Sequence, residues 1–219
     1  MTDHGPGTPF YFHTKLDQTI LLGVRAKNVK QLLHGIRTVP ESSIYHHTHR
    51  FLLQHQYLSP EPPNDFAYWV TEIVGNAALG ERLASIDIVQ FDSIAVLRER
   101  FADILESCVT SEEYRPETNH GDDFHFMASR TFVIPTPFVA HDLREFMDIL
   151  GKISLNALYY HVFDAKLRLG KGENDFSRWL RDQARDDIAD KIKRLDPYAQ
   201  TLEGLRRRII GLLGRDDRN

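Results

Sequence analysis

Residues 43–47 read Ser-Ile-Tyr-His-His, and residues 157–161 read Ala-Leu-Tyr-Tyr-His. Upstream of each segment, apolar residues recur at helical spacing, over Val29–Val39 and over Leu143–Ile153. The first of these stretches predicts a helix over 28–38. Two stretches of the chain therefore carry the same apolar pattern followed by the same short motif.

The agreement continues downstream of both segments. An Asn-Asp-Phe-x-x-Trp box follows at 64–69 and again at 174–179. Asn is a preferred helix cap, so we expect Asn64 to begin a helix whose buried side includes Phe and Trp. Matches that keep their order along a chain indicate an internal repeat. The sequence therefore predicts an all-α fold, an internally duplicated helical bundle with about five helices in each copy.

The expected boundaries follow from this comparison. Copy one is expected at 10–108, a polar linker without periodicity at 109–130, and copy two at 131–213; the two copies either share one core or form separate domains. The segments Phe10–Phe12 and Thr131–Ile134 are β-prone. We expect of them no more than a minor two-stranded β ribbon.

Composition excludes several classes of protein. The 219 residues carry a net charge of −4 and are 42% hydrophobic, as in an ordinary globular protein. The absence of a basic excess argues against nucleic-acid binding. A single cysteine, Cys108, rules out an internal disulfide framework. With no apolar run of membrane-spanning length and no secretion signal in the sequence, we expect a cytoplasmic protein with neither nucleic acid nor membrane as a partner.

The densest group of chemically versatile side chains is a histidine cluster. His46 and His49 share one helix face by their spacing, and His55 is a candidate third ligand for a divalent metal. The chain contains no His-Glu-x-x-His motif and no paired cysteines. No cofactor is predicted from these residues, and a divalent metal is the alternative.

Polar and aromatic residues at corresponding positions of the two copies form a second candidate site. These residues are His47, Asn64, Asp65, Trp69, His161, Asn174, Asp175 and Trp179. Around a common cleft they would suit a polyol or a sugar. In the other interpretation, the Asn residues cap helices, the Trp residues fill cores and the histidines tie helices together. The sequence leaves both interpretations open.

Several motifs in order resemble a known family. The chain has an aromatic-x-aromatic start, Ser-Ile-Tyr-His-His-Thr-His-Arg-Phe at 43–51, Asn-Asp-Phe-Ala-x-Trp at 64–69 and a late Leu-Arg pair. This combination is similar to a bacterial and archaeal family defined as a domain of unknown function, from Phe10 to about Leu213. The resemblance implies no activity, catalytic residue or cofactor.

The sequence thus favours a non-catalytic accessory, regulatory or protein-interaction module, with no catalytic residue identified. We expect a protein partner, and a homodimer is a further possibility. The alternative is a histidine-centred protein that binds a metal or a small ligand, with a metal-dependent hydrolase as one form of it and the site in copy one.

Overall fold

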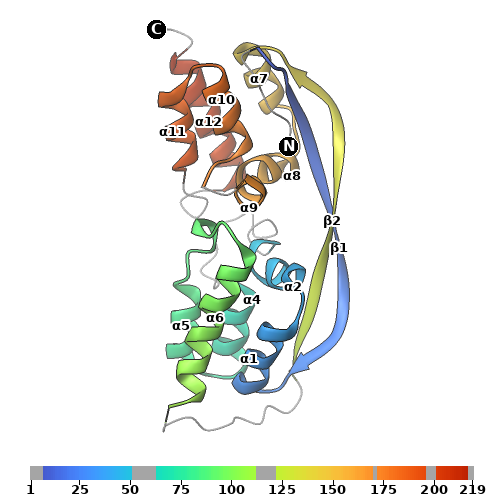
Figure 1. Cartoon of the computed structure of the whole chain (residues 1–219), viewed down its shortest axis with the longest axis vertical. Helices are drawn as coiled ribbons and strands as arrows, with labels where there is room; N and C mark the ends of the chain where they lie inside the picture. The colour runs from blue at the N-terminus through green and yellow to red at the C-terminus, as the bar shows by residue number, and fades with distance from the viewer. Residues whose placement is uncertain (1–6, 51–62, 112–121, 170–171, 196–200, 217–219) are drawn as a thin grey trace. The chain divides into compact units, whose positions relative to one another are not determined.

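The computed structural model describes residues 7–50, 63–111, 122–169, 172–195 and 201–216 (Figure 1). These residues form two compact units. Unit 1 contains the described residues up to Leu16 and from Thr131 onward, and unit 2 contains those from Asp17 to Arg130. The division therefore falls within both strands of the sheet.

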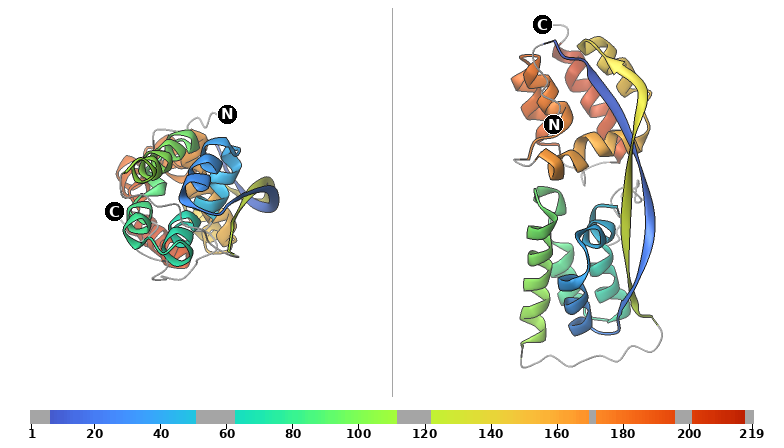
Figure 2. Two further views of the ribbon diagram at one scale, coloured as in Figure 1. Left: turned by 90° about the horizontal axis from the view of Figure 1, so that it is seen from below. Right: turned by 45° about the vertical axis from the view of Figure 1, so that its right-hand side comes forward.

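Two long strands form an antiparallel two-stranded sheet, which we call the ribbon (Figures 1 and 2). Strand β1 is Phe10–Ala26 and strand β2 is Phe124–Ala140, each of 17 residues. Both are rich in the β-branched and aromatic residues that favour extended backbone. In unit 1, the Thr136 hydroxyl donates a hydrogen bond of 2.6 Å to the Phe12 carbonyl and ties the two strands together.

The prediction of an all-α, internally duplicated helical bundle is wrong, because these strands make the fold α+β. Residues 124–130, expected in the polar linker, are the first part of β2. The expected ribbon exists and is not minor. Its strands show no regular alternation of burial, and Thr131–Pro135 are all exposed. A strand that lacks this alternation gives no period-2 signal in its sequence.

Unit 2 packs its helices against its part of the ribbon. Its helical elements are α1 (Val29–Thr38), α2 (Glu41–Tyr45), the π-helix η1 (His46–Arg50), α4 (Asp65–Tyr68), the π-helix η2 (Trp69–Ile73), α5 (Ala77–Ala84), the 3₁₀ turn η3 (Ile88–Gln90) and α6 (Ile94–Val109). The Asn64 side chain accepts a hydrogen bond of 2.8 Å from the Ala67 amide, which confirms its predicted role as a cap. Phe124 and Phe126 of β2 are buried against Phe66 of α4.

Unit 1 is built in a similar way. Its helices are α7 (Leu143–Leu150), α8 (Leu155–Tyr159), the π-helix η4 (Tyr160–Asp164), α9 (Ala165–Leu169), α10 (Asp175–Asp182), α11 (Asp186–Lys193) and α12 (Leu202–Asp216). Asn174 caps α10 in a capping box with Ser177. Phe10 and Phe12 of β1 are buried against Phe146 of α7. Among the described helices, none has the length and apolar character needed to cross a membrane.

Candidate functional site

In unit 2, a buried histidine links the helices to β2. His47 lies in η1, and its Nδ1 donates a hydrogen bond of 2.7 Å to Asp65 Oδ2. Its Nε2 accepts the Met127 amide of β2 at 3.0 Å. An acceptor nitrogen carries no proton, so the ring is neutral. Both nitrogens of His47 are therefore used to hold the structure together.

In unit 1, His161 of η4 makes the same kinds of bond. Its Nδ1 donates to Asp175 Oδ2 at 2.7 Å, and its Nε2 accepts the His13 amide of β1 at 2.8 Å. Burial lowers the pKa of His161. Arg168 adds a hydrogen bond of 2.6 Å to the same carboxylate oxygen. Burial opposes ionisation of Asp175, but His161 and Arg168 hold the pKa of its carboxyl below the usual value.

The indole N–H groups of the tryptophans and the side-chain oxygens of the asparagines in the predicted ligand site make internal hydrogen bonds. The Trp69 indole N–H donates to the Asp122 carbonyl at 2.9 Å, and that of Trp179 donates to the Thr8 carbonyl at 3.0 Å. Asn174 caps its helix, as Asn64 does. The structure thus brings four of the candidate residues together in each unit. A single cleft shared by both sets stays a prediction.

The predicted metal ligands lie among hydrogen-bonding side chains. Arg50 can only donate, so the Nδ1 of His46, 3.2 Å from Arg50 and 2.9 Å from the Ser129 hydroxyl, accepts. Burial, with contributions from His47 and Arg50, lowers the pKa of His46 to about 4. The Nδ1 of His49 is bonded to Thr48 at 3.0 Å.

No three His, Cys, Asp or Glu residues in the described part of the chain are grouped to hold a metal ion, and His55 lies outside that part. The metal site therefore stays a prediction.

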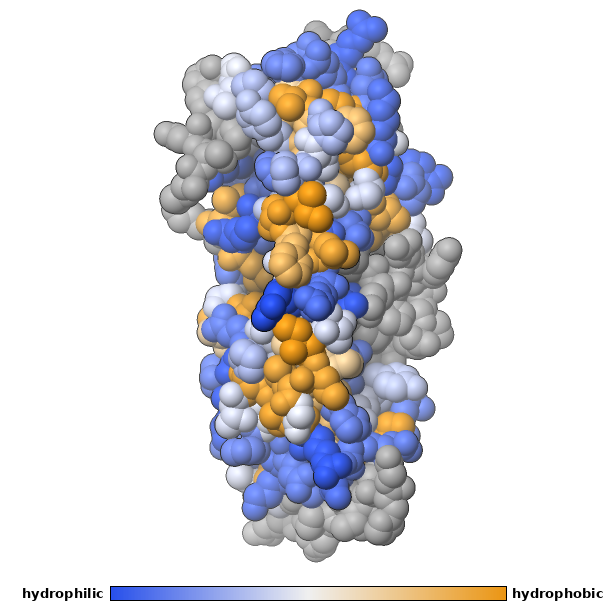
Figure 3. All heavy atoms as spheres, turned by 90° about the vertical axis from the view of Figure 1, so that its right-hand side faces the viewer, coloured by the Kyte–Doolittle hydropathy of each residue, from blue (hydrophilic) through white to orange (hydrophobic). Residues whose placement is uncertain are grey.

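The ribbon carries most of the large apolar side chains that are exposed. Among the described residues these are Tyr11, Leu16, Leu21, Val24, Phe132, Val133 and Ile134 on the ribbon, with Tyr68 and Val96 on helices. Figure 3, which faces the ribbon, shows apolar side chains gathered along it among hydrophilic ones. We call Leu16, Phe132, Val133 and Ile134, all in unit 1, the apolar strip. The sequence marked 131–134 as β-prone but gave no sign that these residues are exposed.

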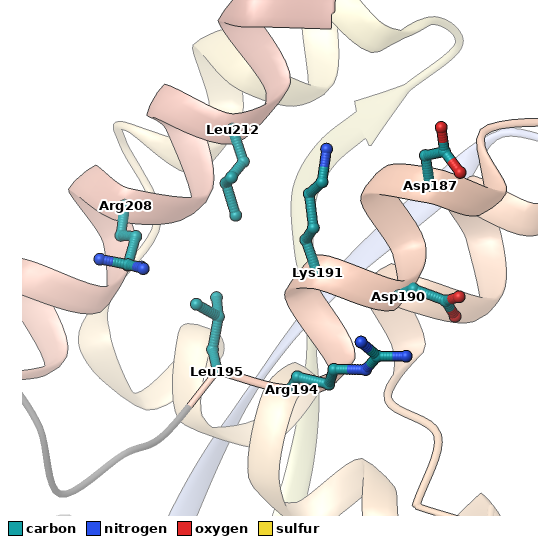
Figure 4. A pocket seen from close by; sticks show the side chains of 7 residues that line it. All are labelled: Asp187, Asp190, Lys191, Arg194, Leu195, Arg208 and Leu212. Carbon is teal, nitrogen blue, oxygen red and sulfur yellow. The ribbon is translucent and has the colours of Figure 1, made fainter.

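Unit 1 also contains two cavities. One of about 380 Å³ lies beside His161, and Arg168 and Tyr160 are among its lining residues. We call it the Arg168 cavity. Another, of about 560 Å³ and wide open, lies between α11 and α12 (Figure 4). Its cations Lys191, Arg194 and Arg208 point in different directions, so they do not form one binding point.

Comparison with known proteins identifies the family of this chain. The model of DUF5752, a family of unknown function, matches residues 7–214. The chain belongs to this family. The resemblance inferred from the sequence motifs, to a family of unknown function, is confirmed. The chain is also similar to OrfY from Thermoproteus tenax, with 28% identity, a TM-score of 0.83 and 98% of each chain covered. No curated protein matches.

Proposed function

We propose that this protein is a non-catalytic interaction module that binds a partner protein through the apolar strip. One observation carries the proposal. Five consecutive strand residues, Thr131–Pro135, are exposed, and three of them are large and apolar. Successive strand side chains point to opposite faces, so at this point neither face of β2 is covered.

Leaving such residues in water is energetically unfavourable for an isolated chain. Phe132, Val133 and Ile134 are 45%, 46% and 43% exposed, and Leu16 on β1 is 57% exposed. Complete burial of a side chain of this size is worth about 1.5–3 kcal/mol. Phe132 and Ile134 share one face of β2 by this alternation, and exposed apolar residues that are grouped mark an interaction site more often than scattered single residues do. Aromatic and aliphatic groups at its centre would act as anchors.

The edge of β2 favours a partner that contacts side chains over one that adds a strand. Pro135 and Pro137 have no backbone N–H. Residues two apart in a strand direct their backbone groups to the same edge, so both missing N–H groups lie on one edge of β2. Because β2 pairs with β1 through this region, the missing donors belong to the free edge. Proline at a free edge opposes addition of another strand.

The polar networks support the non-catalytic part of the proposal. His47 and His161 use both ring nitrogens for structural bonds, which leaves neither free to act as a general base. An accessory or regulatory role is the form of action that we propose. Location in the cytoplasm stays a prediction.

The test compares an apolar-strip variant with a matched control. Phe132→Ser/Ile134→Thr removes apolar surface from the strip, and Val96→Thr changes an apolar residue on α6 that is more accessible than either, at 58% exposed. Each of the three proteins is used to capture binding proteins from native extract. A protein that the wild type and Val96→Thr retain, but the strip variant does not, is purified and its affinity for all three is measured by calorimetric titration. We expect the strip variant to weaken binding by about tenfold or more, which corresponds to about 1.4 kcal/mol.

Sedimentation of the same three proteins detects self-association. A dimer that only the strip variant dissociates would make a second copy the partner. The proposal is contradicted if the wild type is a monomer and every protein that it retains from the extract is also retained by the strip variant. Circular dichroism melting confirms that all three proteins are folded.

A further inference from the structure

We infer that the Arg168 cavity binds a neutral, polyhydroxylated ligand of the sugar or polyol class. This inference goes beyond the proposed function and does not depend on it, because the cavity and the apolar strip are formed by different side chains. Its volume of about 380 Å³ is within the range of small-molecule sites, about 300–1,000 Å³.

The walls of the cavity combine apolar and polar groups. The apolar part consists of Phe10, Tyr11, Phe12, Pro135 and the ring of Tyr160, and the polar part of His13, Thr136, His161, Arg168 and Asp175. Ligand sites generally pair apolar walls with a few fixed polar groups. Sugar rings have apolar C–H faces and polar edges, so both kinds of wall have a function in binding them.

The key donor is held in a fixed position. The Arg168 guanidinium lies 4.3 Å from the centre of the Tyr160 ring and donates to Asp175 Oδ2 at 2.6 Å. A guanidinium has five N–H groups, and Asp175 is the one hydrogen-bond partner that the described residues give it. The side chain is 41% exposed, so its remaining donors are accessible to a ligand.

The charges in the cavity favour a neutral ligand. Arg168 is balanced by the carboxylate of Asp175, which stays ionised because its pKa is lowered, and burial keeps His161 neutral by lowering its pKa. A phosphate or carboxylate drawn to Arg168 would also meet the Asp175 carboxylate, and an ammonium group would meet Arg168. A hydroxyl both donates and accepts, so it can bind to either member of the pair.

The test is an NMR titration of the ¹⁵N-labelled full chain. The neutral probes are glucose, galactose, maltose, sucrose and inositol, each up to tens of millimolar. The charged probes are sodium phosphate, sodium acetate and choline chloride. We expect at least one neutral probe to shift the amides of His13 and the Tyr160–Asp175 region to saturation, and the charged probes to leave them unshifted.

Two variants and one control make the test specific. Arg168→Gln should weaken binding of that probe by about tenfold, the loss of one hydrogen bond from a charged donor. Tyr160→Phe keeps the ring and should weaken it less. Arg37→Gln in unit 2 should change nothing; Arg37 is 42% exposed and donates to Glu106 at 2.8 Å, so it closely matches Arg168 in setting.

The inference is wrong if no neutral probe shifts these amides, if phosphate or acetate shifts them more strongly, or if Arg168→Gln binds as the wild-type does. The variant spectra show whether each protein is folded. Should Arg168→Gln be unfolded, Arg168→Lys, which keeps the charge but loses the planar set of donors, decides: unchanged affinity would overturn the assignment.

Discussion

Units 1 and 2 tie their helices to the ribbon in the same way and differ in the charges beside the tie. His161 bonds Asp175 and the His13 amide, as His47 bonds Asp65 and the Met127 amide. Next to His161 lies a buried ion pair. Next to His47 lies a cluster of neutral and cationic side chains. The common contacts identify what the structure requires, and the differences show where the two units depart from one another.

The ion pair in unit 1 joins Lys15 of β1 to Asp164 of η4 at 2.6 Å, with side-chain exposures of 1% and 11%. The comparable space in unit 2 holds Ser129 of β2, His46 and Arg50. A buried ion pair is sensitive to loss of one partner, since the other charge is then left without compensation. The two units should therefore respond differently to substitution on the strand.

The largest expected difference comes from that substitution. Lys15→Met should reduce the free energy of unfolding by about 3–5 kcal/mol, because it removes the cation that lies 2.6 Å from the buried Asp164 carboxylate. Ser129→Ala, the counterpart in unit 2, should cost about 1 kcal/mol for one hydrogen bond. Urea unfolding measures both. Equal losses would mean that Asp164 reaches water, and Lys15→Met/Asp164→Leu should recover much of the loss.

Acid should affect the side chains next to the two histidines unequally. His46 titrates near 4 in the folded chain and near 6.5 when unfolded, so between these values the unfolded state takes up a proton that the folded state refuses. Above pH 6.5 this difference does not lower the free energy of unfolding. As the pH falls towards 4, the free energy of unfolding decreases by about 3 kcal/mol.

The substitution His46→Asn removes this titration and should flatten the plot of unfolding free energy against pH over that window. Tyr160 occupies the place beside His161, and burial raises the pKa of its hydroxyl, so it stays neutral. Tyr160→Phe should leave the slope as it is. An unchanged slope in His46→Asn would show that the ring is protonated in the folded chain.

The histidine ties themselves should be equivalent. His47→Phe and His161→Phe each leave a strand amide, of Met127 or His13, without its acceptor, at a cost of about 1–3 kcal/mol. We expect both losses in unfolding free energy, measured by chemical denaturation, to fall within this same range. A much larger loss for one of them would show that the two ties are not alike.

The smallest effects belong to the surface. Arg37→Gln breaks one exposed pair in unit 2 and should cause no measurable loss. Arg181 in unit 1 contacts Glu173, Asp186 and Asp190, so Arg181→Gln should cost up to about 1 kcal/mol and less at high salt. Thermal melting at low and high salt separates the two. If Arg37→Gln lowered the melting temperature as much as Arg181→Gln does, the network of ion pairs around Arg181 would be no more stabilising than the isolated pair.

Local patterns predicted the helices well. The helix expected over 28–38 is α1, Val29–Thr38, because its apolar face and its Asn28 cap are both written in consecutive residues. The ribbon was underestimated because its partners are distant in sequence: Thr136 bonds Phe12 across 124 residues. Pairing at such separation leaves no local signal.

The candidate site was predicted in part. The sequence singled out His47, Asp65, His161 and Asp175, and the structure joins them as two pairs. It did not single out Arg168, whose role depends on a carboxylate seven residues further along the sequence. The pairing of residues 15 and 164 was also missed, because each charge alone resembles an ordinary surface residue.

The π-helical turn η4 has a consequence for chain length. A π-turn holds one residue more than an α-turn, and each α-helical residue rotates the chain by about 100°. Deleting Val162 would remove this extra residue and restore α-geometry, so Asp164 would keep its place opposite Lys15, as His161 would keep its own. A one-residue deletion in this turn would then preserve both the ion pair and the histidine tie, whereas a deletion in a neighbouring α-helical turn would rotate the side chains beyond it by about 100°.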